Sequence, residues 1–316
     1  MMNSTRRNFI KTGFVVVAGI TVSPDIMALT PQVSTCPTIC IFSKCLQFLD
    51  YQQLAEIIAK LGFDGVDLPV RKDGQVIPEN VKDELPKVSK ELQKVGKVIS
   101  MIATDIVDAN DPITEDILET ASSLGIRYYR MGRLTYDHSL SINQNLDKHK
   151  RTIQSLESLN RKYQIHGCIQ NHSGPYNMVG APVWDLHYLL KDSDPEYIGV
   201  QYDIMHATAE GVYSWPLGLE LVSPWIKTID IKDFIWEKDK SEKWNTKIIP
   251  LGEGMVNYRK FIKEIKRLNI HAAYSVHCEY DLGGAENGSL HPEMEADEIY
   301  KKIKRDLSFF KTLDQS

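Results

Sequence analysis

Short apolar runs alternate with helical patterns along almost the whole chain, and this alternation limits the possible folds more than any other feature. One helical pattern places Leu54, Ile58 and Leu61 on the same face and stops at Gly62, and an apolar run follows directly. Eight such runs occur, at 38–42, 63–70, 98–104, 126–132, 166–171, 197–203, 226–232 and 271–280. Continuous apolar strands separated by helices are typical of a parallel sheet that helices cover.

The spacing of these runs predicts an α/β protein, and specifically a single-domain (β/α)8 TIM barrel over residues 30–316. No low-complexity tract or linker rich in Pro and Ser divides this region. The alternative is a doubly wound open sheet. That fold is disfavoured because no Gly-x-Gly-x-x-Gly motif follows the first predicted strand.

Residues 1–28 read as an export signal that precedes the barrel. Arg6, Arg7 and Lys11 stand before a Gly- and Val-rich apolar run that is too short to span a bilayer, so no integral membrane segment is expected. The stretch from Thr5 to Lys11 resembles a twin-arginine signal, which a receptor reads, and this implies a periplasmic protein. A basic amphipathic first helix is the alternative.

The charge balance argues against nucleic acid as a partner. The chain has 37 basic and 42 acidic residues, a net charge of −5. Removing residues 1–28 takes away three basic residues and one acidic residue, which leaves −7. Because proteins that bind nucleic acids usually carry a basic face, a small molecule is the more reasonable partner.

Polar side chains gather at the ends of the last four predicted strands. At the C-terminal end of a barrel strand, residues i and i+2 point inward together, and this is where barrel enzymes carry their active sites. The residues at these positions are Gln170 and His172, Gln201 and Asp203, Asp230 and Lys232, and His277 and Glu279, with His206 just beyond the sixth strand. Any one of them alone is commonly a cap or a packed core group. The same pattern on four neighbouring strands predicts an active site.

Three of these residues, Asp203, Asp230 and Glu279, are carboxylates that would repel one another in one barrel mouth. Two such charges about 4 Å apart cost about 4 kcal/mol at an effective dielectric constant of about 20. A bound cation removes this cost. Oxygen ligands with one or two imidazoles suit Mg²⁺, Mn²⁺ or Zn²⁺, so one divalent metal ion is expected.

The chain resembles the xylose isomerase-like barrel superfamily of sugar isomerases and epimerases, which includes tagatose 3-epimerase. The resemblance is carried by the segments LGFDGVDLPV (61–70), IQNHSGP (169–175), YDIMHATAEG (202–211), IDIKDF (229–234), PLGEG (250–254) and SVHCEYD (275–281). It implies that Gln170, Asp203, Asp230 and Glu279 stand at the four metal-ligand positions. Asp203 and Glu279 have the family's residue types, whereas Gln170 replaces a Glu and Asp230 replaces a His.

The resemblance also implies catalytic roles. In the family two Glu residues exchange protons on opposite faces of the sugar, but Gln170 cannot take a proton. Glu279, or a histidine such as His206 or His277, is then left as the working base, unless His172 replaces the missing acid. The family uses the position of His206 to bind substrate.

Weaker candidates complete the predicted site. Lys232 could polarise a carbonyl or enolate oxygen, or could form a salt bridge. Arg130, His277 and Gln201 are candidate substrate-binding residues; for Arg130 the alternative is a structural pairing with Asp105.

The predicted function is that of a metal-dependent isomerase or epimerase that acts on a keto-sugar by proton transfer next to the carbonyl group, through an enediolate. A lyase or hydratase that uses the same first step is the alternative, because it needs only one base. A non-catalytic sugar-binding barrel is the third hypothesis. The superfamily's apurinic endonucleases are disfavoured by the export signal, the acidic charge and the lack of a multi-histidine set. The sequence does not indicate an oligomeric state.

Overall fold

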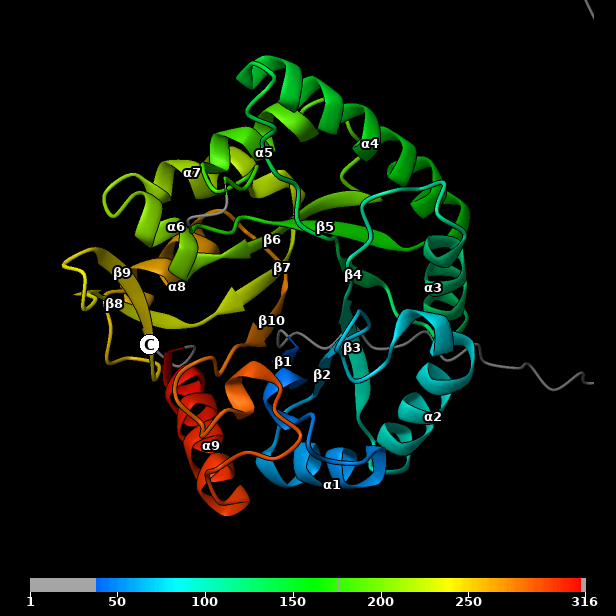
Figure 1. Ribbon diagram of the computed structural model, residues 1–316, viewed down its shortest axis with the longest axis vertical. Coiled ribbons are helices and arrows are strands. Elements are labelled where there is room, and N and C mark those ends of the chain that lie inside the picture. The colour runs from blue at the N-terminus through cyan, green and yellow to red at the C-terminus, as the bar shows by residue number, and fades with distance from the viewer. Residues whose placement is uncertain (1–37, 175–176, 314–316) are drawn as a thin grey trace, which may run out of the picture. The chain divides into compact units, whose positions relative to one another are not determined.

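The computed structural model describes residues 38–174 and 177–313, and the predicted export signal lies outside these ranges. Within them eight parallel strands close into a barrel in the order β1-β10-β7-β6-β5-β4-β3-β2 (Figure 1). The barrel strands are β1 (Ile39–Phe42), β2 (Gly65–Pro69), β3 (Val98–Ala103), β4 (Tyr128–Arg130), β5 (His166–Gln170), β6 (Ile198–Asp203), β7 (Ile226–Ile231) and β10 (Ala273–Val276). Each lies inside one of the eight predicted ranges, so the predicted TIM barrel is confirmed and the open sheet is wrong.

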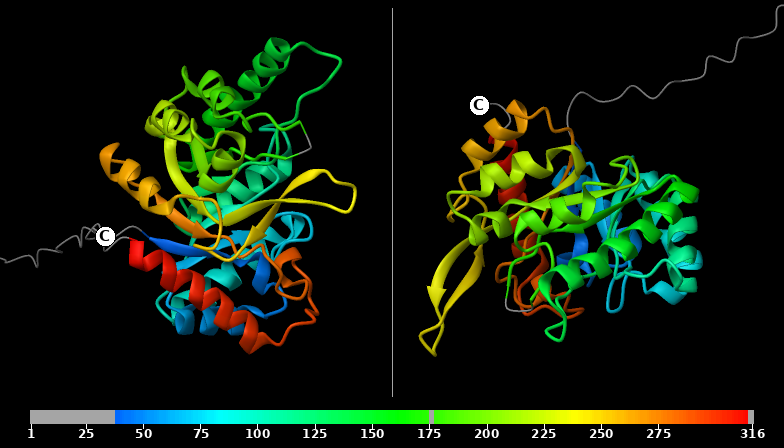
Figure 2. Two further views of the ribbon diagram at one scale, coloured as in Figure 1. Left: turned by 90° about the vertical axis from the view of Figure 1, so that its left-hand side faces the viewer. Right: turned by 90° about the horizontal axis from the view of Figure 1, so that it is seen from above.

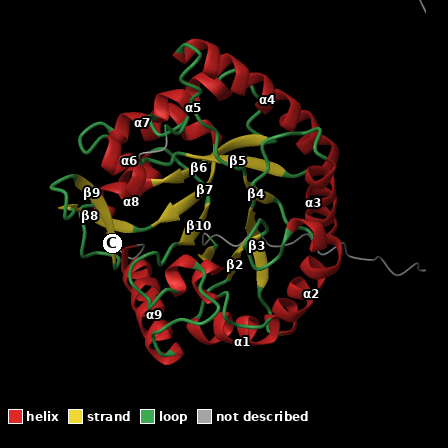
Figure 3. Ribbon diagram, viewed as in Figure 1, coloured by secondary structure: helices red, strands yellow, loops and turns green. Residues whose placement is uncertain are grey.

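Helices surround the ring of strands (Figure 3). They are α1 (Tyr51–Leu61), α2 (Val81–Lys94), α3 (Pro112–Ser123), α4 (Ile142–Tyr163), α5 (Val183–Leu190), α6 (Ile204–Glu210), α7 (Trp215–Val222), α8 (Tyr258–Arg267) and α9 (Ala296–Leu313). None of the helices in the described ranges is long and apolar enough to cross a membrane.

The first helix shows how local sequence sets these elements. The side chain of Asp50 accepts a hydrogen bond from the backbone N–H of Gln53, and the Gln53 side chain accepts one from the backbone N–H of Asp50, which forms a capping box. Leu54 and Ile58 are buried against the barrel. Gly62 ends the helix with a φ of 87°, a left-handed conformation that glycine adopts without strain.

A two-stranded antiparallel hairpin, β8 (Asp233–Lys238) and β9 (Trp244–Ile249), is inserted directly after β7. It projects from the barrel wall, as the yellow ribbon in Figure 2 shows. Trp236 is 41% exposed and Trp244 is 61% exposed. This hairpin was not predicted from the sequence, because most of its residues are exposed and charged residues are concentrated at its tip.

Asp233 fixes the chain at the point where the barrel strand passes into the hairpin. Its Oδ1 accepts hydrogen bonds from the backbone N–H groups of Phe234 (2.9 Å) and Val256 (3.1 Å), and its Oδ2 accepts from those of Gly252 and Gly254 (both 3.0 Å). A Cβ atom on Gly254 would lie 2.1 Å from Asp233 Oδ1, so only glycine fits there. The two motifs IDIKDF and PLGEG are therefore joined by one carboxylate.

Candidate active site

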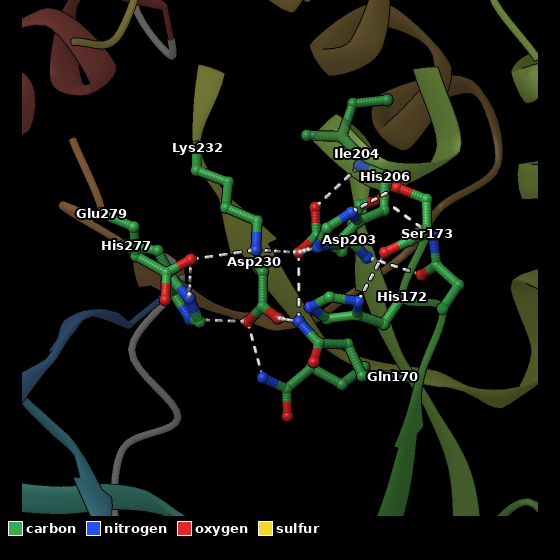
Figure 4. Close-up of polar contacts among 12 residues, drawn as sticks. Gln170, His172, Ser173, Asp203, Ile204, His206, Asp230, Lys232, His277 and Glu279 are labelled. Carbon is green, nitrogen blue, oxygen red and sulfur yellow. Dashed lines mark hydrogen bonds and ion pairs between the residues drawn. The ribbon is translucent and has the colours of Figure 1, made fainter. Parts of the chain in front are cut away.

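The polar residues predicted at the strand ends converge at one end of the barrel (Figure 4). The strand register brings them together, because Gln170 of β5 is paired with Gln201 of β6, and Asp203 of β6 with Asp230 of β7. Lys232 follows β7 directly, and Glu279 follows β10. The tyrosine hydroxyl of Tyr258 donates to the backbone carbonyl of Lys232 at 2.7 Å, which holds that residue in place.

The amide of Gln170 joins two carboxylates rather than replacing one. Its Nε2 donates to Asp230 Oδ2 at 2.7 Å and to Asp203 Oδ2 at 3.1 Å. A Glu at this position would add a third negative charge where two already face each other. The amide instead supplies hydrogen-bond donors to both, but it cannot exchange a proton at neutral pH.

Lys232 is the buried cation of the site. Its Nζ lies 3.0 Å from Asp203 Oδ2 and 3.1 Å from Glu279 Oε2, and its side chain is 3% exposed. Burial by itself would lower the pKa of Lys232, but the charges of Asp203 and Glu279 outweigh burial and raise it above its ordinary value. The ammonium group therefore stays charged and links the ends of β6 and β10.

Glu279 is held at both oxygens. Lys44, which follows β1, lies 2.7 Å from Oε1, and Lys232 lies 3.1 Å from Oε2. Burial would raise the pKa of Glu279, but the positive charges around it, that of Lys232 above all, hold it well below its usual range. Both carboxylate oxygens are therefore occupied by lysine ammonium groups.

Asp230 and His277 form a second buried pair. His277 Nε2 lies 3.1 Å from Asp230 Oδ1 and 3.8 Å from Asp67 Oδ2. Burial opposes a charge on His277, but Asp230 more than offsets this and raises the pKa of His277 to about 10. Gln201 donates to Asp230 Oδ1 at 2.6 Å and is fully buried. His277 and Gln201, predicted to bind substrate, thus lie in the barrel core.

The four predicted metal-ligand residues are hydrogen-bonded or ion-paired to groups of the chain itself. Every carboxylate oxygen of Asp203, Asp230 and Glu279 has a nitrogen of the chain within 3.1 Å, and Gln170 turns its Nε2 toward the two aspartates. The ammonium groups of Lys44 and Lys232, together with the neutral donors, offset part of the repulsion between the carboxylates.

A different group of residues could hold a metal ion. Asp67, Asp230 and His277 each offer one ligand atom, these atoms lie within 4.8 Å of one another, and all three residues are buried. Asp67 Oδ1 is also a buried oxygen without a hydrogen-bond partner in the described ranges. An unsatisfied carboxylate oxygen beside an imidazole suits a divalent ion. Of the predicted ligands, only Asp230 belongs to this group.

His172 and His206 lie side by side, with ring centroids 4.0 Å apart. His172 Nδ1 is 2.7 Å from the carbonyl oxygen of Ser173. A carbonyl only accepts hydrogen bonds, so Nδ1 carries the proton and Nε2 keeps a lone pair. Burial, aided by the charge of Lys232, lowers the pKa of His172 to about 3, so the ring is neutral.

His206 has a mainly structural setting. Its backbone N–H donates to Asp203 Oδ1 at 3.1 Å, so the Asp-x-x-His motif includes the N-cap of α6. Its Nδ1 lies 2.7 Å from Ser173 Oγ, and its Nε2 lies 3.6 Å from Asp203 Oδ2. The His206 side chain is 7% exposed and therefore reaches solvent less than His172 does.

A cavity opens beside Gln170 and His172. Arg130, predicted from the fourth strand, lines it and donates to Gln170 Oε1 at 3.5 Å. Arg71 and Arg133 also line it, although the sequence analysis did not select them. Arg71 and Lys44 each follow a strand end by two residues, so the rule applied to the last four strands would have found both on the first two.

The model of one protein family, described as "Xylose isomerase-like TIM barrel", matches residues 55–306. Among curated protein sequences none matches the chain. Solved structures match over most of the described chain. One is a probable 3-DHS dehydratase involved in petrobactin synthesis from Bacillus anthracis, with 14% identity and a TM-score of 0.62, covering 86% of this chain and 98% of that one.

Two epimerases are similar in the same way. The 3-keto-D-glucoside 4-epimerase from E. coli has 11% identity and a TM-score of 0.64, with 88% of this chain and 100% of that chain covered. The D-psicose 3-epimerase from Clostridium cellulolyticum, solved with D-tagatose, has 11% identity and a TM-score of 0.64, with 88% and 99% covered. At such identities these matches show a shared fold.

Proposed function

The chain belongs to the xylose isomerase-like TIM barrel family, and from this premise we propose that it is an enzyme that removes a proton from the carbon next to the carbonyl group of a keto-sugar. Epimerisation at such a carbon and elimination of a substituent one carbon further both begin with this step. The epimerases and the dehydratase that share the fold carry out reactions of these two kinds by name. The proposal therefore concerns the common first step.

His172 carries the proposal, since it combines a free lone pair with access to a cavity. Its Nε2 has no hydrogen-bond partner in the described ranges, and Nδ1–H is held by Ser173. His172 takes the α-proton at Nε2 and becomes an imidazolium. The negative charge that forms on the substrate opposes the influence of Lys232 on the ring and raises the pKa of His172 as the proton arrives.

In this proposal the other predicted residues stabilise the negative charge of the enediolate or position the group that does so. Lys232 stabilises the enediolate electrostatically, because its ammonium group is buried and stays charged. Glu279 and Asp203 position Lys232 through their ion pairs. Gln170 donates to both aspartates and leaves its Oε1 on the cavity side, toward Arg130.

The predicted divalent ion, Mg²⁺, Mn²⁺ or Zn²⁺, would be held by Asp67, Asp230 and His277, and His277 would release its proton as the ion binds. Bound there, it would supply positive charge beside Asp230, to which Gln170 donates. The proton transfer by His172 does not depend on it.

Elimination or hydration is a second candidate reaction, and the two ion pairs of Glu279 with lysines favour it. Epimerisation generally needs two groups that exchange protons on opposite faces of the carbon. Here Gln170 cannot exchange one, and both oxygens of Glu279 are held by lysines. A single base at His172 is sufficient to eliminate a β-substituent or to add water to an enone.

Exchange of the α-hydrogen in D₂O, followed by NMR on a panel of ketoses and 3-keto-glycosides, tests the proposal. We expect wild-type protein to incorporate deuterium and His172→Gln to do so about 10²- to 10⁴-fold more slowly. The matched control is His291→Gln, an exposed histidine outside the cavity. No exchange with any sugar, or full exchange by His172→Gln, would contradict the proposal. A new epimer indicates epimerisation, and a released substituent indicates elimination.

We further propose that the protein is exported to the periplasm through its twin-arginine-type signal and acts there on a small sugar. The support is the sequence around Arg6 and Arg7.

A further inference from the structure

The cavity beside His172 is basic. Three arginine side chains line it, Arg71 after β2, Arg130 at the end of β4 and Arg133 in the loop that follows. Among the described residues of its lining, Asp105 is the one carboxylate. Three positive charges and one negative charge give the lining a net charge of +2, in a chain whose overall charge is −5.

These arginines make no direct ion pair with a carboxylate within the described ranges. Within the described ranges the guanidinium groups of Arg71 and Arg133 make no hydrogen bond or ion pair, and Arg130 donates only to the neutral Gln170, at 3.5 Å. By contrast, the exposed Arg161 lies 3.0 Å from Asp194. Arg71 and Arg130 are half-buried, and a half-buried cation without a bound counter-ion is costly, because the cavity wall solvates the charge less well than water does.

An aromatic ring brings two of the three arginines together. The guanidinium carbons of Arg71 and Arg130 lie 5.6 Å and 5.3 Å from the centroid of the Phe42 ring. Cation–π contact lowers the cost of placing them there but leaves both charges in place. Burial first, and then the charge of Arg130, lower the pKa of Arg71 from its ordinary value, although Asp105 and Asp67 act in the opposite direction. Two guanidinium groups beside one ring repel each other. A bound anion would remove this repulsion.

We infer that this cavity binds the oxyanion of a negatively charged keto-sugar, held by Arg71 and Arg130 with Arg133 at the rim. The inference rests on the proposed function, and it adds the substrate class. Guanidinium groups match the two oxygens of a carboxylate, or two oxygens of a phosphate, through paired N–H donors. Because His172 lines the same cavity, a sugar anchored by its charged end places its carbon chain beside the base.

Isothermal titration calorimetry at fixed ionic strength tests this inference without requiring turnover. The probes are D-fructuronate, D-fructose 6-phosphate and D-fructose, which present a carboxylate, a phosphate and no charge. We expect at least one anionic sugar to bind tenfold or more tightly than D-fructose, and its identity tells which oxyanion the site takes. Arg71→Gln and Arg130→Gln should each weaken that binding about 10- to 100-fold, since each removes charge-assisted hydrogen bonds. Arg151→Gln, an exposed arginine on α4, should leave it unchanged.

Two outcomes overturn the inference. One is that neither anion binds more tightly than D-fructose, and the other is that both arginine variants, shown to be folded by circular dichroism, bind the anion as wild type does. The deuterium-exchange experiment separates this inference from the proposed function. Arginine-dependent anion binding without α-hydrogen exchange on any sugar contradicts the proposed function alone. Exchange on D-fructose without any preference for anions contradicts the substrate class alone.

Discussion

Replacing Lys232 with methionine removes the cation that links Asp203 and Glu279 and keeps a side chain of similar length. The Lys232 side chain is 3% exposed and that of Asp203 is fully buried, so Asp203 loses its charged partner inside the barrel. Removing one partner of a buried ion pair costs about 3–5 kcal/mol. With an unfolding entropy of about 2.1 cal/mol/K per residue over roughly 280 residues, the Tm should fall by about 5–9 °C.

The loss should depend on the charge of Asp203. In Lys232→Met the pKa of Asp203, which burial already raises, loses its main opposing influence. A folded-state pKa above the unfolded value means that the folded chain binds the proton more tightly, so stability falls as pH rises above about 4. The deficit of Lys232→Met relative to wild type should therefore be larger at pH 8 than at pH 4. Adding Asp203→Asn should recover most of the lost stability at pH 8.

The control is Lys247→Met on the hairpin. Lys247 Nζ lies 3.0 Å from Glu237 Oε2, the same distance as in the Lys232–Asp203 pair, but the side chains are 56% and 46% exposed. Exposed pairs contribute about 0–1 kcal/mol, so the Tm should change by less than about 2 °C. Thermal unfolding of the full chain, followed by circular dichroism, measures both variants. Equal Tm changes for Lys232→Met and Lys247→Met would refute the argument that Lys232 is a buried, charge-compensating residue.

Three further predictions concern export, metal and pH. Arg6→Lys/Arg7→Lys should abolish export, since the twin-arginine receptor reads the arginine pair; unchanged periplasmic protein by immunoblot would contradict this. Elemental analysis of protein purified without chelator should find about one divalent ion per chain. Asp67→Asn should lose this ion, and Glu279→Gln should retain it, because Glu279 is ion-paired with Lys44 and Lys232. The reverse pattern would favour the four ligands first predicted. Burial raises the pKa of Asp306 from 3.8 to about 6, so the folded chain binds this proton more tightly and stability should fall between about pH 4 and 6. In denaturant unfolding at pH 8, Asp306→Asn should be more stable than wild type by up to about 3 kcal/mol. A loss of stability there would show that the hydrogen bond from Leu251 N–H to the carboxylate (3.3 Å) dominates.

Much of the barrel could be predicted from the sequence because its signals are local. Each apolar run is one strand, and a helix such as α1 shows its own apolar period and its own caps, Asp50 and Gly62. The β8–β9 hairpin was not predicted, since its mostly exposed and charged residues show no clear apolar period.

The positions of the polar residues were also predictable from local sequence. A residue at a parallel strand end is directed to the barrel mouth by the strand itself, so Gln170, Asp203 and Glu279 could be selected without knowing their neighbours. What the strand rule does not supply is the partner of each group. Whether two groups form a hydrogen bond or an ion pair depends on differences of a few tenths of an ångström in their distance, and the groups lie on strands that are far apart in the sequence.

The partner of each group depends on the closure of the barrel, which brings distant parts of the chain together. Lys44 reaches Glu279 across 235 residues because β1 and β10 are neighbours where the ring closes. The same closure places Asp67 of β2 near His277. It also places the guanidinium groups of Arg71 and Arg130 over the aromatic ring of Phe42. The sequence alone therefore determined that charged residues meet at the barrel mouth. Which groups of the chain lie beside each charge, such as Lys232 beside Asp203, was decided by tertiary structure, because charge compensation depends on which atoms are adjacent in space.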